Sequence, residues 1–140
     1  MIGILIIAHG ALGDSLIHCA AHVLGARPEH LEHLSVTVHD DPAVMLARAR
    51  TLVRSLDQGD GVLILSDMYG ATPCNIVCRL LEPGSVEGVS GANLPMLVRA
   101  LTYRNEPLGT VIGKALSGGH EGIVNINEEV CHAAPRCKDR

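Results

Sequence analysis

Residues 2–10 read Ile-Gly-Ile-Leu-Ile-Ile-Ala-His-Gly. Residues 2–8 are apolar without a break, and most of them are β-branched, which is the pattern of a strand buried on both faces. Strands of this kind belong to parallel sheets whose two faces are covered by helices. The stretch therefore predicts a parallel α/β sheet, and it places His9 in the loop directly after the first strand.

The rest of the chain alternates between strand-like and helix-like segments. Further strands are predicted at residues 33–38, 62–66 and 86–89, and helices between a cap at Asp14 and Gly25 and over residues 42–56, 72–81, 93–103 and 108–116. This alternation implies a doubly wound, mainly parallel four-stranded sheet in the order 2-1-3-4. A last strand is predicted over residues 123–126, and residues 127–140 are predicted to form a polar tail without regular structure.

The composition limits the class of protein. The chain has 140 residues and a formal net charge of −4, which suits one domain. Its apolar runs are too short to span a bilayer, and no positively charged region precedes the first run, so the expected compartment is the cytoplasm. The five cysteines are then expected to be reduced thiols. Without Phe, Trp or a basic surface, nucleic acid is not an expected partner.

Two residues that point to chemistry follow the first and third predicted strands. Ligands of open parallel sheets collect outside these strand ends, where the winding reverses direction. His9 and Asp67 stand there, and the order 2-1-3-4 brings them together. A carboxylate bonded to one imidazole nitrogen leaves the other free to act as a base, a metal ligand or a nucleophile. Such loop residues also often do no more than cap turns.

Residues 70–73, which read Gly-Ala-Thr-Pro, narrow these alternatives. Gly70 allows the backbone to bend closely past a ligand, and the free N–H groups that start the third helix attract an anion. The Thr72 hydroxyl is a further donor. Capping alone explains Thr72 and Pro73 equally well, but it does not explain a histidine that faces them. The segment therefore favours phosphate binding beside His9.

Three segments in order resemble the enzyme IIA domains of the mannose family of the bacterial sugar phosphotransferase system. They are residues 6–10 (IIAHG), residues 65–75 (LSDMYGATPCN) and residues 90–97 (SGANLPML). The resemblance runs to about residue 126, so residues 1–126 are expected to form the enzyme IIA domain. The family commonly shows two glycines and a serine where this chain has Gly70, Ala71 and Thr72. The hydroxyl is kept, while the flexibility of the loop is expected to differ.

The resemblance implies a phosphocarrier, a component of a phosphotransferase with a phosphohistidine intermediate. His9 would accept a phosphoryl group from the carrier HPr and pass it to an enzyme IIB, expected on a separate chain, for sugar uptake. Asp67 would hold the imidazole, and the loop of Gly70, Ala71 and Thr72 would hold the phosphoryl oxygens. The family's domains are homodimers, often closed by exchange of a C-terminal strand, for which residues 123–126 are the candidate. Contact with a membrane permease would be peripheral, and the scheme requires no metal or cofactor.

Two other functions fit the same residues. In the first, the chain is a regulatory module whose phosphorylation at His9 is read by a target protein, and no sugar moves. In the second, it is the phosphocarrier of a dihydroxyacetone kinase, a family that keeps the histidine but usually departs from the pattern of residues 70–75.

The cysteines offer two further candidate sites, a redox or metal role for one pair on the third helix and metal binding in the tail, and neither is favoured. Cys74 and Cys78 lie one turn apart on the third helix, and two ligands do not complete a zinc site, so both are expected to fill the core. Cys131, His132 and Cys137 form an incomplete metal-binding pattern in the tail.

Overall fold

A computed structural model describes residues 1–132 of the chain. Its strands are β1 (Gly3–His9), β2 (Leu31–Val36), β3 (Val62–Ser66) and β4 (Val86–Ser90). They form one sheet in the order β2-β1-β3-β4, and every neighbouring pair is parallel. The predicted fold class and strand order are therefore confirmed. β1 lies in the interior of the sheet, between β2 and β3.

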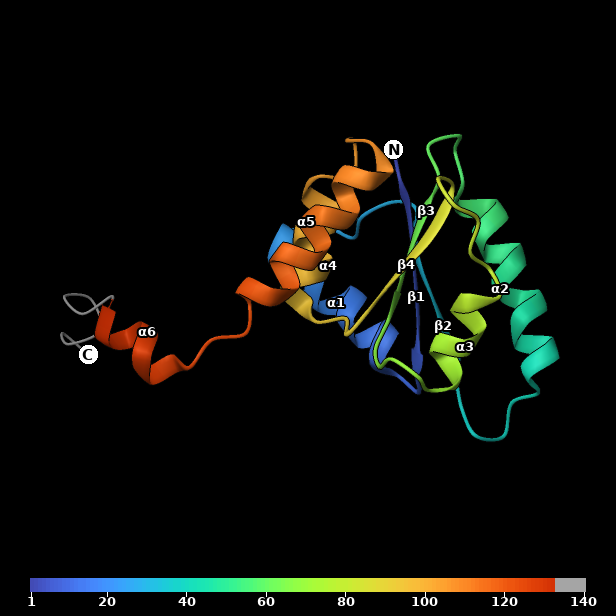
Figure 1. The fold of residues 1–140 in the computed structure, drawn as a ribbon, viewed down its shortest axis with the longest axis horizontal. Coiled ribbons are helices and arrows are strands. Elements are labelled where there is room, and N and C mark those ends of the chain that lie inside the picture. Colours follow the sequence, from blue (N-terminus) through green and yellow to red (C-terminus); the bar gives the residue numbers. More distant parts are fainter. Residues whose placement is uncertain (133–140) are drawn as a thin grey trace.

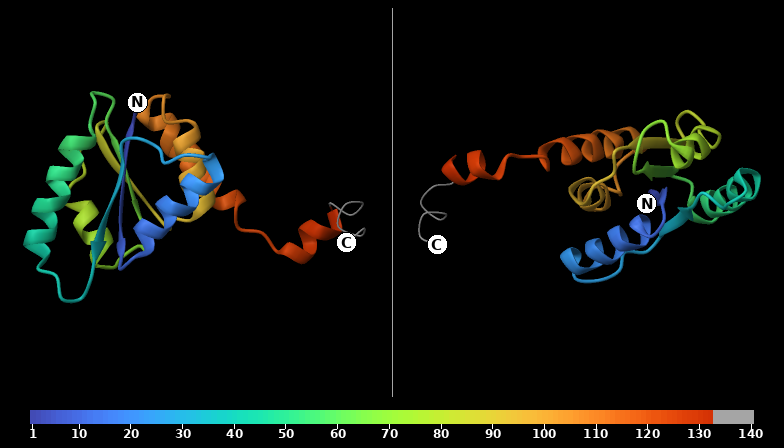
Figure 2. Two further views of the ribbon diagram at one scale, coloured as in Figure 1. Left: turned by 180° about the vertical axis from the view of Figure 1, so that it is seen from behind. Right: turned by 90° about the horizontal axis from the view of Figure 1, so that it is seen from below.

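Helices cover both faces of this sheet (Figure 1). One face is covered by α1 (Leu12–Leu24), α4 (Leu94–Thr102) and α5 (Leu108–Glu121), and the other by α2 (Pro42–Leu56) and α3 (Thr72–Cys78). The views from behind and from below show the same three layers (Figure 2). This arrangement explains why residues 2–8 are apolar without a break. Ile4 and Ile6 of β1 pack toward the first group of helices and Leu5 and Ile7 toward the second, all four at 0% exposure.

Three helix ends follow the local signals in the sequence. The Asp41 carboxylate caps α2 by accepting the N–H of Ala43 at 3.0 Å, and Pro42 occupies the first turn. The Asn93 side chain caps α4 by accepting the N–H of Met96 at 2.9 Å. Gly25 ends α1 with a left-handed φ of 88°.

Other boundaries differ from the predictions. α1 begins at Leu12 with Ala11 as its cap, so Asp14 lies inside the first turn, where its carboxylate instead pairs with His33 at 3.4 Å. β2 begins and ends two residues earlier than predicted. Its end is set by Asp40, which accepts the N–H of Thr37 at 2.7 Å and turns the chain out of the sheet.

The third and fifth helices differ in length from the predictions. α3 ends at Cys78, because the N–H groups of Arg79 and Leu80 bond to carbonyls three residues back and tighten the chain into a turn. α5 continues to Glu121 instead of ending before its paired glycines. Those glycines pack against α4, where a Cβ at Gly118 would lie 2.9 Å from that of Arg99.

The strand predicted over residues 123–126 is wrong for this structure. Residues 123–125 have no regular structure, and α6 (Ile126–His132) follows, so the tail is not unstructured over its first residues. The side chain of Asn125 accepts the N–H of Asn127 at 3.0 Å. This contact starts α6, so residues 123–126 do not continue as a strand. α6 stands apart from the three layers (Figures 1 and 2). Residues 133–140, which include Cys137, and the side chains of Cys131 and His132 lie outside the described part.

No helix within residues 1–132 is both long enough and apolar enough to cross a membrane.

Candidate functional site

His9 and Asp67 meet at the carboxyl edge of the sheet. His9 is the last residue of β1 and Asp67 follows β3 directly, and these adjacent parallel strands pair in a register that sets Ile7 beside Ser66. The Asp67 oxygen Oδ2 lies 2.8 Å from Nδ1 of the His9 ring and 3.0 Å from the backbone nitrogen of His9. One carboxylate oxygen therefore holds both the ring and the main chain of His9.

This contact decides which ring nitrogen is available. A carboxylate can only accept hydrogen bonds, so Nδ1 carries the ring proton and donates it to Asp67. In the neutral ring Nε2 then keeps its lone pair. The His9 side chain is 50% exposed and that of Asp67 only 10%. The arrangement therefore presents a nucleophilic nitrogen to solvent and keeps its carboxylate partner covered.

The charge state of Asp67 is fixed by its surroundings. Burial alone would raise the pKa of this carboxyl group, but the hydrogen bonds from the backbone and ring of His9 outweigh burial and bring the pKa below its ordinary 3.8. Asp67 is therefore an anion at neutral pH. It can balance positive charge that develops on the His9 ring during a reaction.

Gly70, Ala71 and Thr72 lie in the loop that joins Asp67 to α3. Gly70 has a left-handed φ of 83°, and no atom lies within 4 Å of the place where a Cβ would stand. Thr72 is the first residue of α3 and Ala71 precedes it, and no side chain caps this helix. The Thr72 hydroxyl is therefore not used as a cap. Since α3 packs against β1, the loop stays next to the end of the strand that carries His9.

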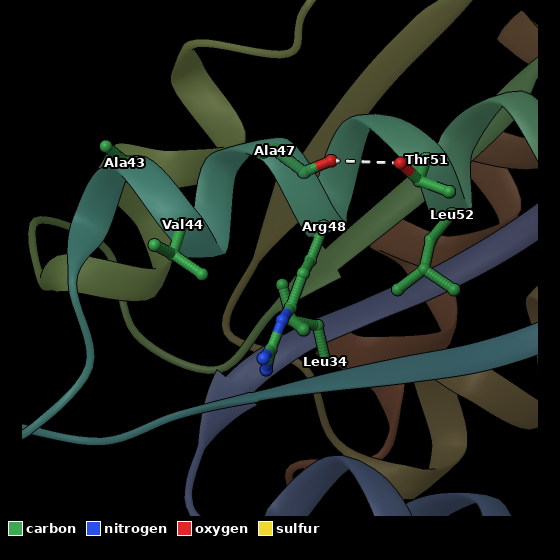
Figure 3. Close-up of a pocket in the computed structure, with 7 residues that line it drawn as sticks. All are labelled: Leu34, Ala43, Val44, Ala47, Arg48, Thr51 and Leu52. Carbon is green, nitrogen blue, oxygen red and sulfur yellow. Dashed lines mark hydrogen bonds between the residues drawn. The ribbon is translucent and has the colours of Figure 1, made fainter.

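His9 lies on an open surface and not in an enclosed pocket. A groove of about 680 Å³ is found elsewhere, between α2 and the edge strand β2 (Figure 3). Its walls are mostly aliphatic, and Arg48 points across it toward Leu34, as the close-up shows. Neither His9 nor Asp67 lines this groove. An open position suits transfer to or from another macromolecule better than the capture of a small substrate.

Two cysteines and two serines line a cavity of about 370 Å³ behind the loop, between α3, β4 and α5. Cys74 is buried as expected, but Cys78 is exposed, so the prediction that both fill the core is wrong for Cys78. Partial desolvation of the thiol and the adjacent Cys74 raise the pKa of Cys78 from its ordinary 9.0, although the residue as a whole is exposed. Within the described residues, no three His, Cys, Asp or Glu side chains are grouped to hold a metal ion.

Sequence reasoning missed two features of this region. The buried hydroxyls of Ser66 and Ser90, paired across β3 and β4, have no hydrogen-bond partner among the described residues. The backbone N–H of His9 also donates to Asp67, a hydrogen bond that no sequence motif predicts. Both features depend on the register of the strand ends, which no residue type in the sequence indicates.

The fold and the site together define a class: small α/β domains with a carboxylate-bound histidine after the first strand and a Gly-Ala-Thr loop after the third. The sequence profile of the EIIA-man family, described as "PTS system fructose IIA component", matches residues 3–113. The chain belongs to this family of IIA components of the sugar phosphotransferase system.

Known proteins agree with this assignment. The chain is 28% identical over 138 residues to the "PTS system mannose-specific EIIAB component" of Escherichia coli K12, an alignment that covers 96% of this chain and 42% of that protein. The phosphotransferase system component EIIA of Streptococcus agalactiae superposes with a TM-score of 0.81 at 26% identity, covering 91% of this chain and 99% of that one. The IIA protein associated with the fucose utilization operon of Streptococcus pneumoniae gives 0.80 at 21% identity, covering 91% and 95%. At 21% identity, the similarity to the Streptococcus pneumoniae protein is evidence for the fold alone.

Proposed function

We propose that this chain is a cytoplasmic phosphocarrier that accepts a phosphoryl group on Nε2 of His9 and passes it on. One observation carries the proposal: Asp67 binds Nδ1 of a half-exposed His9 at 2.8 Å and so leaves Nε2 free. A histidine held in this tautomer is ready for nucleophilic attack.

The proposed step exchanges one nitrogen–phosphorus bond for another. The Nε2 lone pair attacks phosphorus as the bond to the donor's ring nitrogen breaks, and no electrons are gained or lost. The His9 ring becomes cationic as the new bond forms, and the Asp67 carboxylate balances that charge. The departing imidazole takes up a proton and the phosphorylated ring can release its own to solvent, so the proton count is unchanged.

The loop after β3 is proposed to hold the phosphoryl oxygens. Gly70 leaves open space beside the backbone, and the uncapped start of α3 leaves the Thr72 hydroxyl available. With Ala71, these residues would supply backbone N–H groups and one hydroxyl as donors. Phosphoryl transfer needs mainly in-line positioning and charge stabilisation, which such donors provide.

We propose the donor and the acceptor from the family to which the chain belongs. HPr is the proposed donor, and an enzyme IIB, in contact with a membrane permease, the proposed acceptor for sugar uptake. The Escherichia coli relative is described as an EIIAB component, and this chain covers only 42% of it. A IIB partner for this IIA domain is in keeping with that description.

The chain is also proposed to form a homodimer through its C-terminal segment. Ile123, Val124 and Ile126 are 75%, 50% and 72% exposed, which leaves a run of apolar side chains uncovered after α5. A second copy would cover this run. Sedimentation at micromolar concentration should give a dimer, and a clean monomer would remove the dimer while leaving the His9 chemistry in place.

Labelling tests the phosphocarrier proposal. Incubation with phosphoenolpyruvate, enzyme I and HPr should give an acid-labile, base-stable adduct on the wild-type chain and none on His9→Ala. His22→Ala, on the exposed face of α1, serves as the control and should be labelled like wild type. Label on His9→Ala would overturn the proposal. Labelling of His9 without onward transfer to an enzyme IIB would favour the regulatory alternative.

A further inference from the structure

One wall of the groove between α2 and β2 is a second stripe of α2 (Figure 3). Val44, Ala47 and Thr51 follow one another at intervals of three and four residues, which puts them on one side of the helix. They lie outside the core, since α2 packs on the sheet through Met45 and Ala49. Val44 is 45% exposed, and the Thr51 hydroxyl donates to the carbonyl of Ala47 at 3.2 Å, so it needs no outside partner. This stripe is therefore an apolar wall open to solvent.

The other wall is the edge strand β2, whose outer backbone groups are free. β2 pairs only with β1 in the sheet. The carbonyls of His30 and Val36 accept N–H groups from within or directly after β1, both at 3.0 Å. Because the backbone groups of successive residues in a strand point to alternate sides, those of His33 and Ser35 point away from β1. They have no hydrogen-bond partner within residues 1–132.

Arg48 is the single charged residue that lines the groove. Its side chain crosses the groove toward Leu34, as Figure 3 shows, and within the described part of the chain it forms no ion pair. Other arginines are already engaged: Arg27 and Arg99 each pair with a glutamate, and Arg104 bonds to carbonyls. The groove therefore combines apolar walls, a free strand edge and one available positive charge.

An extended peptide fits all three features at once. Added as a strand beside β2, it would pair its main chain with the outward groups of His33 and Ser35, as in β-augmentation. Alternate side chains of the peptide would then point toward α2 and into the groove. A carboxylate among them would pair with Arg48. A helix in the groove would leave the strand edge unpaired, and a flat membrane surface would not reach Leu34, which is buried.

We propose that the groove between α2 and β2 binds an extended segment of a partner protein. In this segment apolar side chains occupy alternate positions, and one aspartate or glutamate pairs with Arg48. Neither His9 nor Asp67 lines the groove, and β2 separates it from β1. The inference therefore goes beyond the proposed function and does not depend on it, because the groove serves a partner other than the phosphoryl donor and acceptor.

A library of random octapeptides displayed on phage and selected on the full chain supplies the probe. The recovered peptides are synthesised, and their binding is measured on wild type and on three variants with unchanged melting temperatures. Arg48→Glu reverses the charge in the groove, and Ala47→Trp fills the groove with an indole ring. Arg54→Glu is the matched control, since it makes the same charge change on an exposed residue of α2 that does not line the groove.

The recovered peptides should carry apolar residues at alternate positions and an acidic residue. Arg48→Glu should weaken their binding about 10-fold or more, Ala47→Trp should abolish it, and Arg54→Glu should bind like wild type. A lysine in place of the acidic residue of the peptide should restore binding to Arg48→Glu. In the complex, the N–H groups of His33 and Ser35 should exchange more slowly with solvent, which a bound helix would not cause. Labelling of His9 through HPr should be the same in all four proteins.

Three results would overturn the proposal. The first is a selection without such peptides, or peptides whose binding neither Arg48→Glu nor Ala47→Trp weakens. The second is unchanged hydrogen exchange in β2, because the peptide is then not an added strand. The third is another occupant: a change of oligomeric state in Arg48→Glu would assign the groove to a second copy, and Arg48-dependent sedimentation with phosphatidylglycerol vesicles would assign it to a membrane.

Discussion

A single oxygen of Asp67 accepts two hydrogen bonds from His9, one from its ring nitrogen Nδ1 at 2.8 Å and one from its backbone nitrogen at 3.0 Å. The backbone contact fixes where the residue lies, and the ring contact fixes which tautomer it adopts. Because the carboxylate is covered and its pKa is lowered, its charge is present throughout the neutral range. Orientation and charge compensation of the His9 ring thus come from one side chain.

Asp67→Asn should slow phosphoryl transfer from phosphorylated HPr. The amide keeps the shape and can still accept the backbone N–H of His9, but it loses the charge that stabilises a cationic ring. We expect a decrease of about 10-fold to 10,000-fold, the upper limit being the effect known for serine protease triads. Rates are compared at a temperature at which both proteins are fully folded. A rate equal to wild type would mean that Asp67 only forms a turn.

The stability of the fold should depend on Asp67 in acid. Its pKa is lower in the folded chain than the ordinary 3.8, so its charge stabilises the fold above that value, and the contribution is lost as the pH falls through the folded pKa. Wild type should exceed Asp67→Asn by about 1–3 kcal/mol in free energy of unfolding near pH 7, and the difference should shrink below about pH 4. Urea titrations measure it. A difference that stays constant into acid contradicts the pKa direction.

Arg104 should be a major determinant of stability although it lies far from His9 in the fold. It is 6% exposed, and its guanidinium donates to the carbonyls of Ile2, Glu29 and His30 at 2.6–3.0 Å. Arg104→Met removes all of these hydrogen bonds, while the carbonyl of His30 keeps the N–H of Ile4 at 3.0 Å. We expect the substitution to lower the free energy of unfolding by about 3 kcal/mol or more. Arg54→Met, on the exposed side of α2, is the control and should change it by less than about 0.5 kcal/mol. Equal effects of the two substitutions would contradict this role.

Two glycines of α5 should respond in opposite directions to alanine. A Cβ at Gly113 meets nothing within 4 Å, so Gly113→Ala should stabilise the helix by about 0.5–1 kcal/mol. A Cβ at Gly118 would lie 2.9 Å from the Cβ of Arg99 and 3.1 Å from the carbonyl oxygen of Pro95. Gly118→Ala should therefore lower the melting temperature while Gly113→Ala raises it. The same sign for both would contradict the close packing of α4 and α5.

The strand order and the pairing of β1 could be predicted from sequence because they depend on strong, local signals. Residues 2–8 are apolar at every position, as a strand buried on both faces requires. The meeting of His9 and Asp67 follows from that order, since adjacent parallel strands end at the same edge. Neither inference needs any knowledge of side-chain packing.

The features that sequence reasoning missed depend on contacts between distant residues. Gly118 and Gly119 look like a helix end, but they are small because α4 packs against them, so α5 continues to Glu121. Residues 123–126 have an apolar pattern that suits a strand, yet Asn125 begins a helix. Arg104 carries no signal in the sequence, because its partners are carbonyls of two other segments.

The position of the phosphoryl group on the ring tests the central claim most directly. Nδ1 is 2.8 Å from Asp67 and is occupied as a donor, so the bond to phosphorus must form at Nε2. The wild-type chain is phosphorylated through enzyme I and HPr, separated from both proteins and kept at alkaline pH, and phosphorus NMR then distinguishes the two isomers of phosphohistidine. We predict one resonance, that of the Nε2 isomer, which is absent in His9→Ala. A resonance of the Nδ1 isomer, or a phosphohistidine signal that persists in His9→Ala, would contradict the assignment of His9 and Asp67 as a functional pair.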